Sequence, residues 1–123
     1  MLQHTNVDAG AESVQEFPHG DIRWGPVGGY TAWKLTAEPG WCYSEHLGPL
    51  EGTEICQEDH MLFIVSGRMG IRMENGEELE TGPGDAVRLP PGHDVWTIGD
   101  ETLVAVGVDP ADADADADEA PSP

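Results

Sequence analysis

Basic residues are scarce in this chain. Its 123 residues include 5 Lys and Arg against 24 Asp and Glu, which gives a formal net charge of −19, and Lys34 is the single lysine. Nucleic acids and anionic membrane surfaces are bound through clustered Lys and Arg, so this balance argues against both classes of partner. The same composition is typical of proteins in a salt-rich cytoplasm, where ions screen the repulsion between carboxylates.

Long apolar runs are also missing. No window is long and apolar enough for a membrane span, and the N-terminus lacks a basic stretch followed by an apolar one. We therefore expect a cytoplasmic protein. Cysteine is limited to Cys42 and Cys56, and two cysteines in a cytosolic chain are more typical of reduced thiols or metal ligands than of a disulfide.

The two ends of the chain differ from its middle. Residues 109–123 are rich in Asp, Ala and Pro and contain no large apolar side chain. Such a segment cannot bury enough surface to offset the entropy lost on ordering, so a disordered acidic tail is predicted. Residues 1–15 are predicted to form a flexible N-terminal segment, which leaves one domain at residues 16–108.

The middle of the chain has the pattern of an all-β domain. Glycines and prolines recur at short intervals between apolar segments, and no long stretch has helical periodicity. Met69, Ile71 and Met73 alternate with small or polar residues, as in a half-buried strand, and Asn75-Gly76 favours a tight hairpin turn. Strands are predicted at residues 30–36, 55–57, 61–66, 69–74, 86–89, 95–98 and 102–108. Many short strands of this kind indicate a sandwich or barrel.

Two motifs place histidines at strand starts. A Pro-Gly-Asp turn at residues 83–85 precedes a short apolar strand, and a Pro-Pro-Gly turn at residues 90–92 delivers His93. Upstream, His60 leads into an apolar run that ends in Val-Ser-Gly-Arg. This order of motifs resembles the cupins, which are small jelly-roll barrels, over roughly residues 28–108. The resemblance implies an all-β jelly-roll fold.

The resemblance also extends to a subgroup. Residues 39–46, Cys56, His60 and residues 92–96 are similar to those of small prokaryotic cupin proteins with a Cys/His variant of the first motif. The acidic composition resembles that of haloarchaeal proteins. Because cupins include dioxygenases, isomerases, storage proteins and ligand-binding domains of regulators, the fold does not fix an activity.

The usual cupin ligand set of three histidines and one glutamate is altered in this chain. In the first motif, His60 occupies the glutamate position, Cys56 the second histidine position and Glu54 the first. In the second motif, Val95 stands where the histidine is expected. His93 lies two residues earlier, on the same face of the strand because side chains alternate with period two.

A second alignment of the first motif is open. His46 lies seven residues after Pro39, about where the first histidine often follows the family's Pro-Gly turn. Residues 47–55 are then an insertion, and His46 faces the barrel with the other candidates. Both His46 and Glu54 therefore remain candidates to complete the ligand set.

The candidate ligands form a soft nitrogen-and-sulfur set: His46, Cys56, His60 and His93. A cysteine thiolate with two or three imidazoles suits Zn²⁺, and Fe²⁺, Ni²⁺ and Co²⁺ are alternatives. Three protein ligands leave an open position for water or substrate, whereas four make a closed structural site. Asp94 is interpreted either as an orienting partner of the His93 imidazole or as a turn residue.

These residues predict a metal-binding cupin with a small-molecule pocket inside the barrel, with or without turnover, and name no catalytic residue. A non-catalytic ligand-binding or sensing module is the alternative, and a structural dimer with the thiol and imidazoles in its core is the third. The pocket walls, or else the core, are Trp33, Trp41, Tyr43 and Trp96. We also expect a homodimer formed through sheet edges, which need covering.

Overall fold

A computed structural model describes residues 2–52 and 59–110 of the chain. The described residues form nine strands, a π-helical turn and one short helix. The strands are β1 (Ser13–Phe17), β2 (Gly20–Val27), β3 (Tyr30–Ala37), β4 (His60–Ser66), β5 (Arg68–Met73), β6 (Glu78–Thr81), β7 (Ala86–Leu89), β8 (His93–Ile98) and β9 (Leu103–Pro110). The π-helical turn η1 (Tyr43–Leu47) continues into α1 (Gly48–Glu51). No helix in this part of the chain has the length and apolarity to cross a bilayer.

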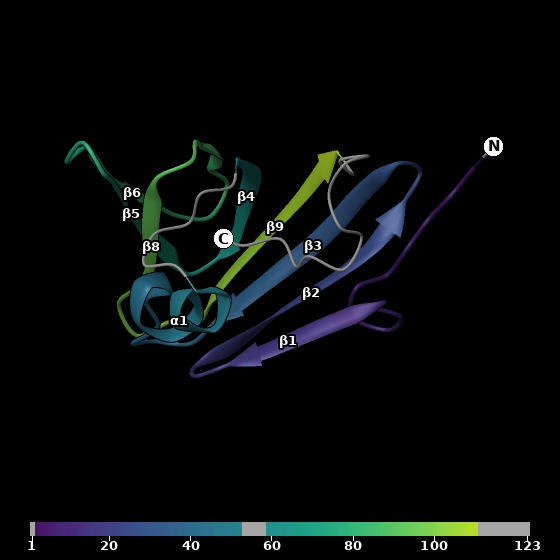
Figure 1. Cartoon of the computed structure of the whole chain (residues 1–123), viewed down its shortest axis with the longest axis horizontal. Helices are drawn as coiled ribbons and strands as arrows, with labels where there is room; N and C mark the ends of the chain where they lie inside the picture. Colours follow the sequence, from purple (N-terminus) through teal and green to yellow (C-terminus); the bar gives the residue numbers. More distant parts are fainter. Residues whose placement is uncertain (1, 53–58, 111–123) are drawn as a thin grey trace.

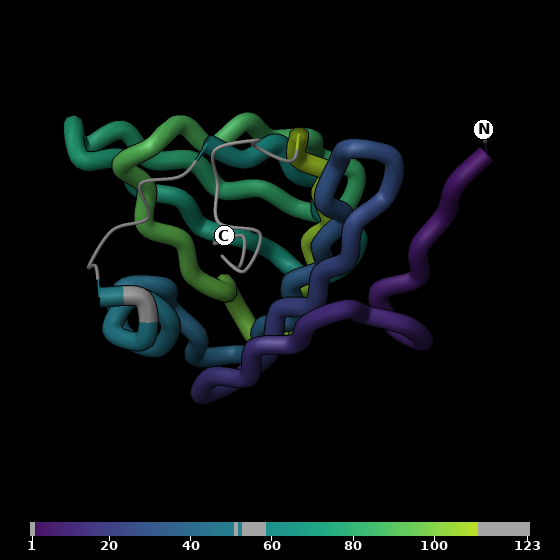
Figure 2. Tube along the Cα trace, turned by 45° about the vertical axis from the view of Figure 1, so that its right-hand side comes forward, coloured from purple at the N-terminus to yellow at the C-terminus, as the bar shows by residue number. Residues whose placement is uncertain are grey.

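The strands form two antiparallel sheets. One has the order β1-β2-β3-β9-β4-β7 and the other has the order β6-β5-β8 (Figure 1). The segment before η1 lies beside β8, because Cys42 forms a bridge with Trp96 (Figure 2). The all-β prediction is confirmed.

Strand alternation builds the core. In β4, Leu62 and Ile64 point inward and are buried, whereas Met61, Phe63 and Val65 point outward. The inward residues of the two sheets meet to form one apolar cluster. Its members are Phe17, Ile22, Trp33, Leu35, Ala37, Trp41, Tyr43, Leu47, Leu62, Ile64, Met69, Ile71, Val87, Leu89, Val95, Leu103 and Ala105.

The predicted strands at residues 30–36, 61–66, 69–74, 86–89, 95–98 and 102–108 are observed with small differences at their ends. The predicted strand at 55–57 lies outside the described residues. The sequence pattern missed β1, β2 and β6. The reason is physical: β1 and β6 are short and mostly polar, and Gly20, Gly25 and Pro26 interrupt β2.

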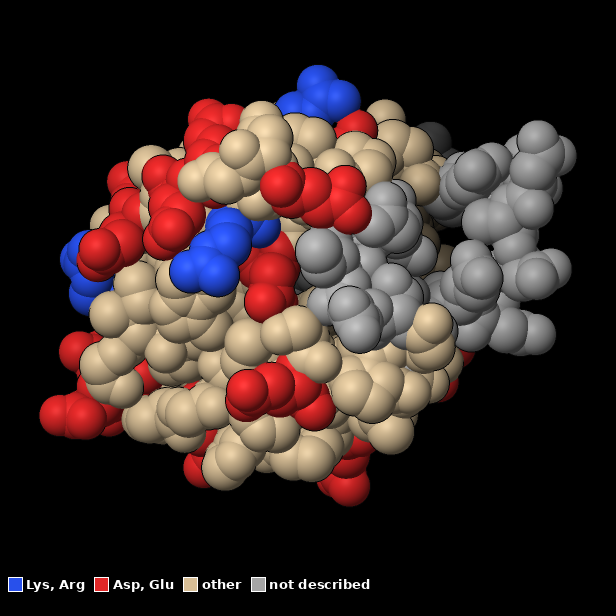
Figure 3. Space-filling model, turned by 60° about the vertical axis from the view of Figure 1, so that its left-hand side comes forward, with Lys and Arg blue, Asp and Glu red and all other residues tan. Residues whose placement is uncertain are grey.

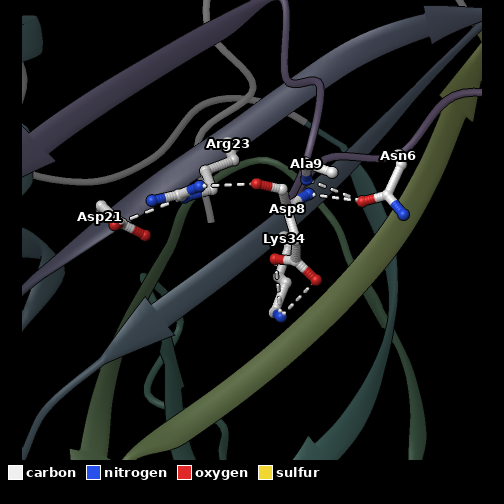
Figure 4. A network of polar contacts seen from close by, with 6 residues as sticks. All are labelled: Asn6, Asp8, Ala9, Asp21, Arg23 and Lys34. Carbon is white, nitrogen blue, oxygen red and sulfur yellow. Dashed lines mark hydrogen bonds and ion pairs between the residues drawn. The ribbon is translucent and has the colours of Figure 1, made fainter.

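The predicted domain boundaries need correction at both ends. Strand β1 begins at Ser13, inside the segment predicted to be flexible, and β9 continues to Pro110, two residues into the predicted tail. The Asn6 side chain accepts hydrogen bonds from the backbone N–H groups of Asp8 and Ala9, both at 2.9 Å (Figure 4). The Asp8 carboxylate pairs with Lys34 at 3.0 Å, so this segment is tied to β3.

A glycine in β9 makes room for a tryptophan at the site described below. A Cβ atom on Gly107 would lie 2.5 Å from two indole carbons of Trp33 and 2.6 Å from the carbonyl oxygen of Met61. Trp33 is almost fully buried, so its indole cannot shift without cost.

We expect Gly107→Ala to destabilise the fold by about 1–3 kcal/mol, because it overpacks this contact. Denaturant unfolding at high salt measures the effect. Gly10→Ala is the matched control: its added Cβ would meet only the Asn6 carbonyl oxygen, at 3.5 Å. Equal stability of the Gly107→Ala variant and the unmodified protein would contradict the packing account.

Candidate functional site

Two of the predicted ligands come together from the two sheets. His60 is the first residue of β4 and His93 is the first residue of β8, so each enters where its strand begins. Their ring centroids are 5.9 Å apart, with 65° between the ring planes. His60 is 2% exposed and His93 is fully buried. Two buried polar rings this close form a candidate binding site within the apolar core.

The Pro-Pro-Gly turn fixes the orientation of His93. Gly92 has φ +93°, a left-handed conformation that glycine adopts without strain. The turn brings the Pro90 carbonyl oxygen to 2.7 Å from His93 Nδ1. A carbonyl only accepts, so Nδ1 donates, and the neutral imidazole then carries its lone pair on Nε2.

Asp109 fixes the orientation of His60 in the same way. One carboxylate oxygen of Asp109, Oδ2, lies 3.2 Å from His60 Nδ1 and accepts the Trp33 indole N–H at 2.7 Å. The Trp33 ring also contacts the His60 ring edge-to-face, at 5.5 Å between centroids. An ionised carboxylate only accepts, so His60 also donates from Nδ1 and carries its lone pair on Nε2.

Asp109 is the residue that sequence reasoning missed, since it was assigned to the disordered tail. The alternation of residues in β9 contains a signal that points to Asp109. In β9, Leu103, Ala105 and Gly107 are the inward positions, and the same period of two makes Asp109 the next one. The register agrees, because Leu62 pairs with Gly107 and so His60 lies across from Asp109.

The remaining donors decide whether a metal ion fits. Cys56 and Glu54 lie outside the described residues. Within residues 2–52 and 59–110, no group of three or more His, Cys, Asp or Glu side chains is arranged to hold a metal ion. The described part of the site thus supplies two oriented imidazoles, and a metal needs at least one further donor from elsewhere in the chain.

His46 belongs to a different part of the molecule. Its ring contacts the ring of His19 at 4.8 Å between centroids, and the His19 carbonyl accepts the Glu38 backbone N–H. Glu38 follows β3 where that strand pairs with Leu103, the start of β9. Asp109 lies six residues further along β9, which is roughly 20 Å at 3.3 Å per residue. The structure therefore does not bring His46 together with His60.

The hydrogen bonding of His46 also disfavours ligation. The Cys42 backbone N–H donates to His46 Nδ1 at 3.0 Å. This bond occupies the lone pair on Nδ1 and leaves the proton of the neutral ring on Nε2. In this arrangement neither ring nitrogen of His46 presents a lone pair to an ion.

Asp94 does not orient the His93 imidazole. It accepts the backbone N–H of Ser44 at 3.0 Å, and the Cys42 sulfur lies 3.7 and 3.8 Å from its two oxygens. Because Asp94 and His93 are neighbours on a strand, their side chains point to opposite faces. Asp94 instead fixes the start of η1 against β8.

The aromatic residues divide between site and core. Trp33 lies at the candidate site, whereas Trp41 and Tyr43 are buried core residues. The indole of Trp96 covers Gly70, where an added Cβ would overlap it, and the Arg72 guanidinium lies 5.8 Å from its ring centroid. Two surface clefts do not include the two site histidines. One is lined by residues of β1, β2 and β3 and of the segments next to them, and the other by residues of β6 and β8.

The strand arginines pair with neighbouring acids. Arg68, Arg72 and Arg88 pair with Glu80, Glu78 and Asp59 at 3.8, 3.5 and 2.7 Å. The hydrogen bond from Arg88 lowers the pKa of Asp59 and raises that of Arg88 itself. These guanidinium groups therefore form ion pairs at the surface rather than contacts in the candidate site.

Comparisons with known proteins agree with the fold. Residues 46–105 match the EutQ-like cupin domain. The polyketide cyclase RemF from Streptomyces resistomycificus superposes with TM-score 0.62 at 20% identity, covering 91% of this chain and 81% of that one. A Cupin 2 conserved barrel domain protein from Salinispora arenicola gives 0.55 at 22% identity, covering 72% and 73%.

Oxalate decarboxylase from Bacillus subtilis, in an S161A variant, gives TM-score 0.62 at 22% identity. The match covers 85% of this chain but 29% of that longer one. No curated protein shows significant sequence similarity to this chain. Residues 46–105 thus match a cupin domain, and the chain shares its fold with these solved structures.

Proposed function

We propose that this cupin domain binds one divalent transition-metal ion inside the barrel, through Nε2 of His60, Nε2 of His93 and the thiolate of Cys56. Zn²⁺ suits this donor set best, and Fe²⁺, Ni²⁺ and Co²⁺ are the alternatives. The observation that carries the proposal is the pair of buried imidazoles whose Nδ1 atoms donate to Asp109 and to the Pro90 carbonyl.

That arrangement is the one metal-binding histidines use. A ligating imidazole almost always donates its other N–H to a carboxylate, a backbone carbonyl or water, which fixes the tautomer and the ring direction. The His60 ring donates to a carboxylate, and the His93 ring donates to a backbone carbonyl. A purely structural pair of core histidines does not require both rings to carry the same tautomer.

The ligand count determines what the site does. Three protein ligands leave one position open for water or a small molecule, on which the metal acts as a Lewis acid. The residues of this chain then bind and orient: Asp109 and Trp33 hold His60, and the Pro-Pro-Gly turn holds His93. The surrounding apolar residues limit access of water to the site.

Elemental analysis of the native protein tests the proposal. The chain is purified at high salt without an affinity tag and without added metal. We expect about one transition-metal ion per chain. A stoichiometry near zero, or full occupancy in a Cys56→Ala/His60→Ala double variant, would contradict the metal site.

Elemental analysis also tests whether His46 is a ligand. We expect His46→Ala to retain full metal content, because its Nδ1 accepts the Cys42 N–H and its ring lies against His19. His93→Ala serves as the comparison and is expected to lose the metal. Loss of metal from the His46→Ala variant would restore the alternative alignment, in which His46 is a ligand.

A further inference from the structure

A cleft of about 480 Å³ lies on the outer side of the smaller sheet. Its lining residues come from β6 and β8, the two strands that flank β5, and they are Glu78, Leu79, Glu80, Trp96 and Ile98. Binding sites for small molecules have volumes of about 300–1,000 Å³, so the cleft is large enough for one. None of its residues belongs to the metal site proposed above.

A glycine in the middle strand opens the cleft. Gly70 of β5 pairs in register with Glu80 on one side and with Trp96 on the other. Because Gly70 has no side chain, the indole of Trp96 lies over its backbone, where an added Cβ would overlap the ring atoms. The cleft therefore has an aromatic ring on one side and a carboxylate on the other.

The lining of the cleft combines apolar surface with negative charge. Trp96 and Ile98 are half-buried and stand at outward positions of β8. Glu78 and Glu80 supply carboxylates, which only accept hydrogen bonds, and none of the described residues that line the cleft is a Lys or Arg. The face of an indole attracts cations electrostatically. These groups favour a ligand that is positively charged and partly apolar, and they disfavour an anion.

The contacts of Arg72 show that these groups hold a cation. Its guanidinium carbon lies 5.8 Å from the centroid of the Trp96 ring, and its Nε atom lies 3.5 Å from a carboxylate oxygen of Glu78. Arg68 pairs with Glu80 more loosely, at 3.8 Å. The side chains of both pairs are 53–69% exposed, and ion pairs this exposed contribute about 0–1 kcal/mol. A ligand cation can therefore displace either arginine at little cost.

We propose that this cleft binds a small organic cation, of the class in which a quaternary ammonium group is joined to a short chain. The methyl groups of such a ligand pack on the indole of Trp96, and its charge lies beside the carboxylates of Glu78 and Glu80. A quaternary ammonium has no N–H group, so it leaves no donor unpaired when it enters an apolar cleft.

The charge of the whole chain supports a cationic ligand. Figure 3 brings forward the left-hand side of Figure 1, where β5, β6 and β8 lie, and shows Asp and Glu spread over this side with few Lys and Arg among them. With a net charge of −19, the chain attracts cations and repels anions. Salt screens this long-range attraction, whereas the contact between the indole and the cation remains.

Titration of the full chain with choline, followed by heteronuclear NMR at constant high ionic strength, tests the proposal. Choline carries a trimethylammonium group, and neohexyl alcohol is its uncharged counterpart, with carbon in place of the nitrogen. We expect choline to shift the indole N–H signal of Trp96 saturably, with a dissociation constant of about 1–10 mM, and to leave the indole signals of Trp33 and Trp41 in place. The uncharged alcohol should bind at least about fivefold more weakly.

Variants locate the binding site, with backbone amide signals of the cleft as the readout. Trp96→Leu should weaken choline binding at least about fivefold, because it removes the aromatic face. Glu78→Gln/Glu80→Gln should weaken it by a similar factor through loss of the charge, and it keeps the test decisive if Trp96→Leu disturbs folding. The matched control is Glu77→Gln/Glu101→Gln, which changes the net charge equally at exposed positions outside the cleft and should bind choline as the unmodified protein does.

Several outcomes would overturn the proposal. They are a Trp96 signal that does not shift saturably, equally strong binding of neohexyl alcohol, undiminished binding in Trp96→Leu, and equal weakening in the two glutamate double variants. Metal content plays no part in this readout, so the cleft and the metal site are tested separately.

Discussion

Replacement of His60 is expected to lower metal affinity by about 100- to 1000-fold. Structural zinc sites with four ligands gain about 10–16 kcal/mol on binding, which corresponds to roughly 3 kcal/mol for each ligand. His60→Ala removes one proposed ligand, and it also leaves the Asp109 carboxylate without its imidazole partner. Competition with a metal-binding dye, in protein freed of metal and reloaded, measures the loss.

His60→Asn separates ligation from folding. Its side-chain amide N–H stands close to where the ring Nδ1–H stands, so it can still donate to Asp109, while nothing replaces Nε2. With both proteins freed of metal, we expect His60→Asn to unfold at nearly the same denaturant concentration as the unmodified protein, and we expect it to fail to take up the metal when reloaded. If His60→Asn binds metal with undiminished affinity, His60 is not a ligand.

Removal of the Asp109 carboxylate is expected to weaken metal binding by about 10- to 100-fold, the usual effect of losing a partner that orients a ligating histidine. Asp109 holds His60 Nδ1 at 3.2 Å and the Trp33 indole N–H at 2.7 Å through a single oxygen. In Asp109→Ala both donors lose their acceptor, which should also cost stability, because each unpaired buried donor is worth about 1–3 kcal/mol.

Asp109→Asn gives the intermediate case. Its amide oxygen can accept from both donors, as the carboxylate oxygen does, so the orientation of His60 is kept and only the charge is lost. We expect a smaller drop in metal affinity than in Asp109→Ala and little change in stability. Asp94→Ala is the control, because that acid contacts Cys42 and Ser44 instead. Equal effects of Asp109→Ala and Asp94→Ala would contradict the orienting role.

The sequence was sufficient for the fold and for the closeness of His60 to His93. Turn residues around residues 83–92 and the alternation of Met69, Ile71 and Met73 are local signals, and they predicted the strands correctly. That the side chains of His60 and His93 lie together was predicted from their positions in the two motifs, not from geometry. Both residues stand at strand starts, which the turns and apolar runs mark clearly.

Other features depend on contacts that no local pattern contains. Asp109 sits in an acidic, low-complexity stretch, and its role appears only when β9 is paired with β4. The position of Trp33 depends on Gly107, which is distant in the sequence but lies against it in the sheet. The position of His46 follows from a backbone hydrogen bond in η1, an irregular turn that hydrophobic periodicity does not predict.

X-ray absorption at the edge of the bound metal tests the ligand set most directly, because it reports which atoms surround the ion. For zinc we expect one sulfur at about 2.3 Å and imidazole nitrogens at about 2.0–2.1 Å, with the sulfur absent in Cys56→Ser. A shell of light atoms alone in the unmodified protein, or a spectrum that Cys56→Ser leaves unchanged, would contradict it.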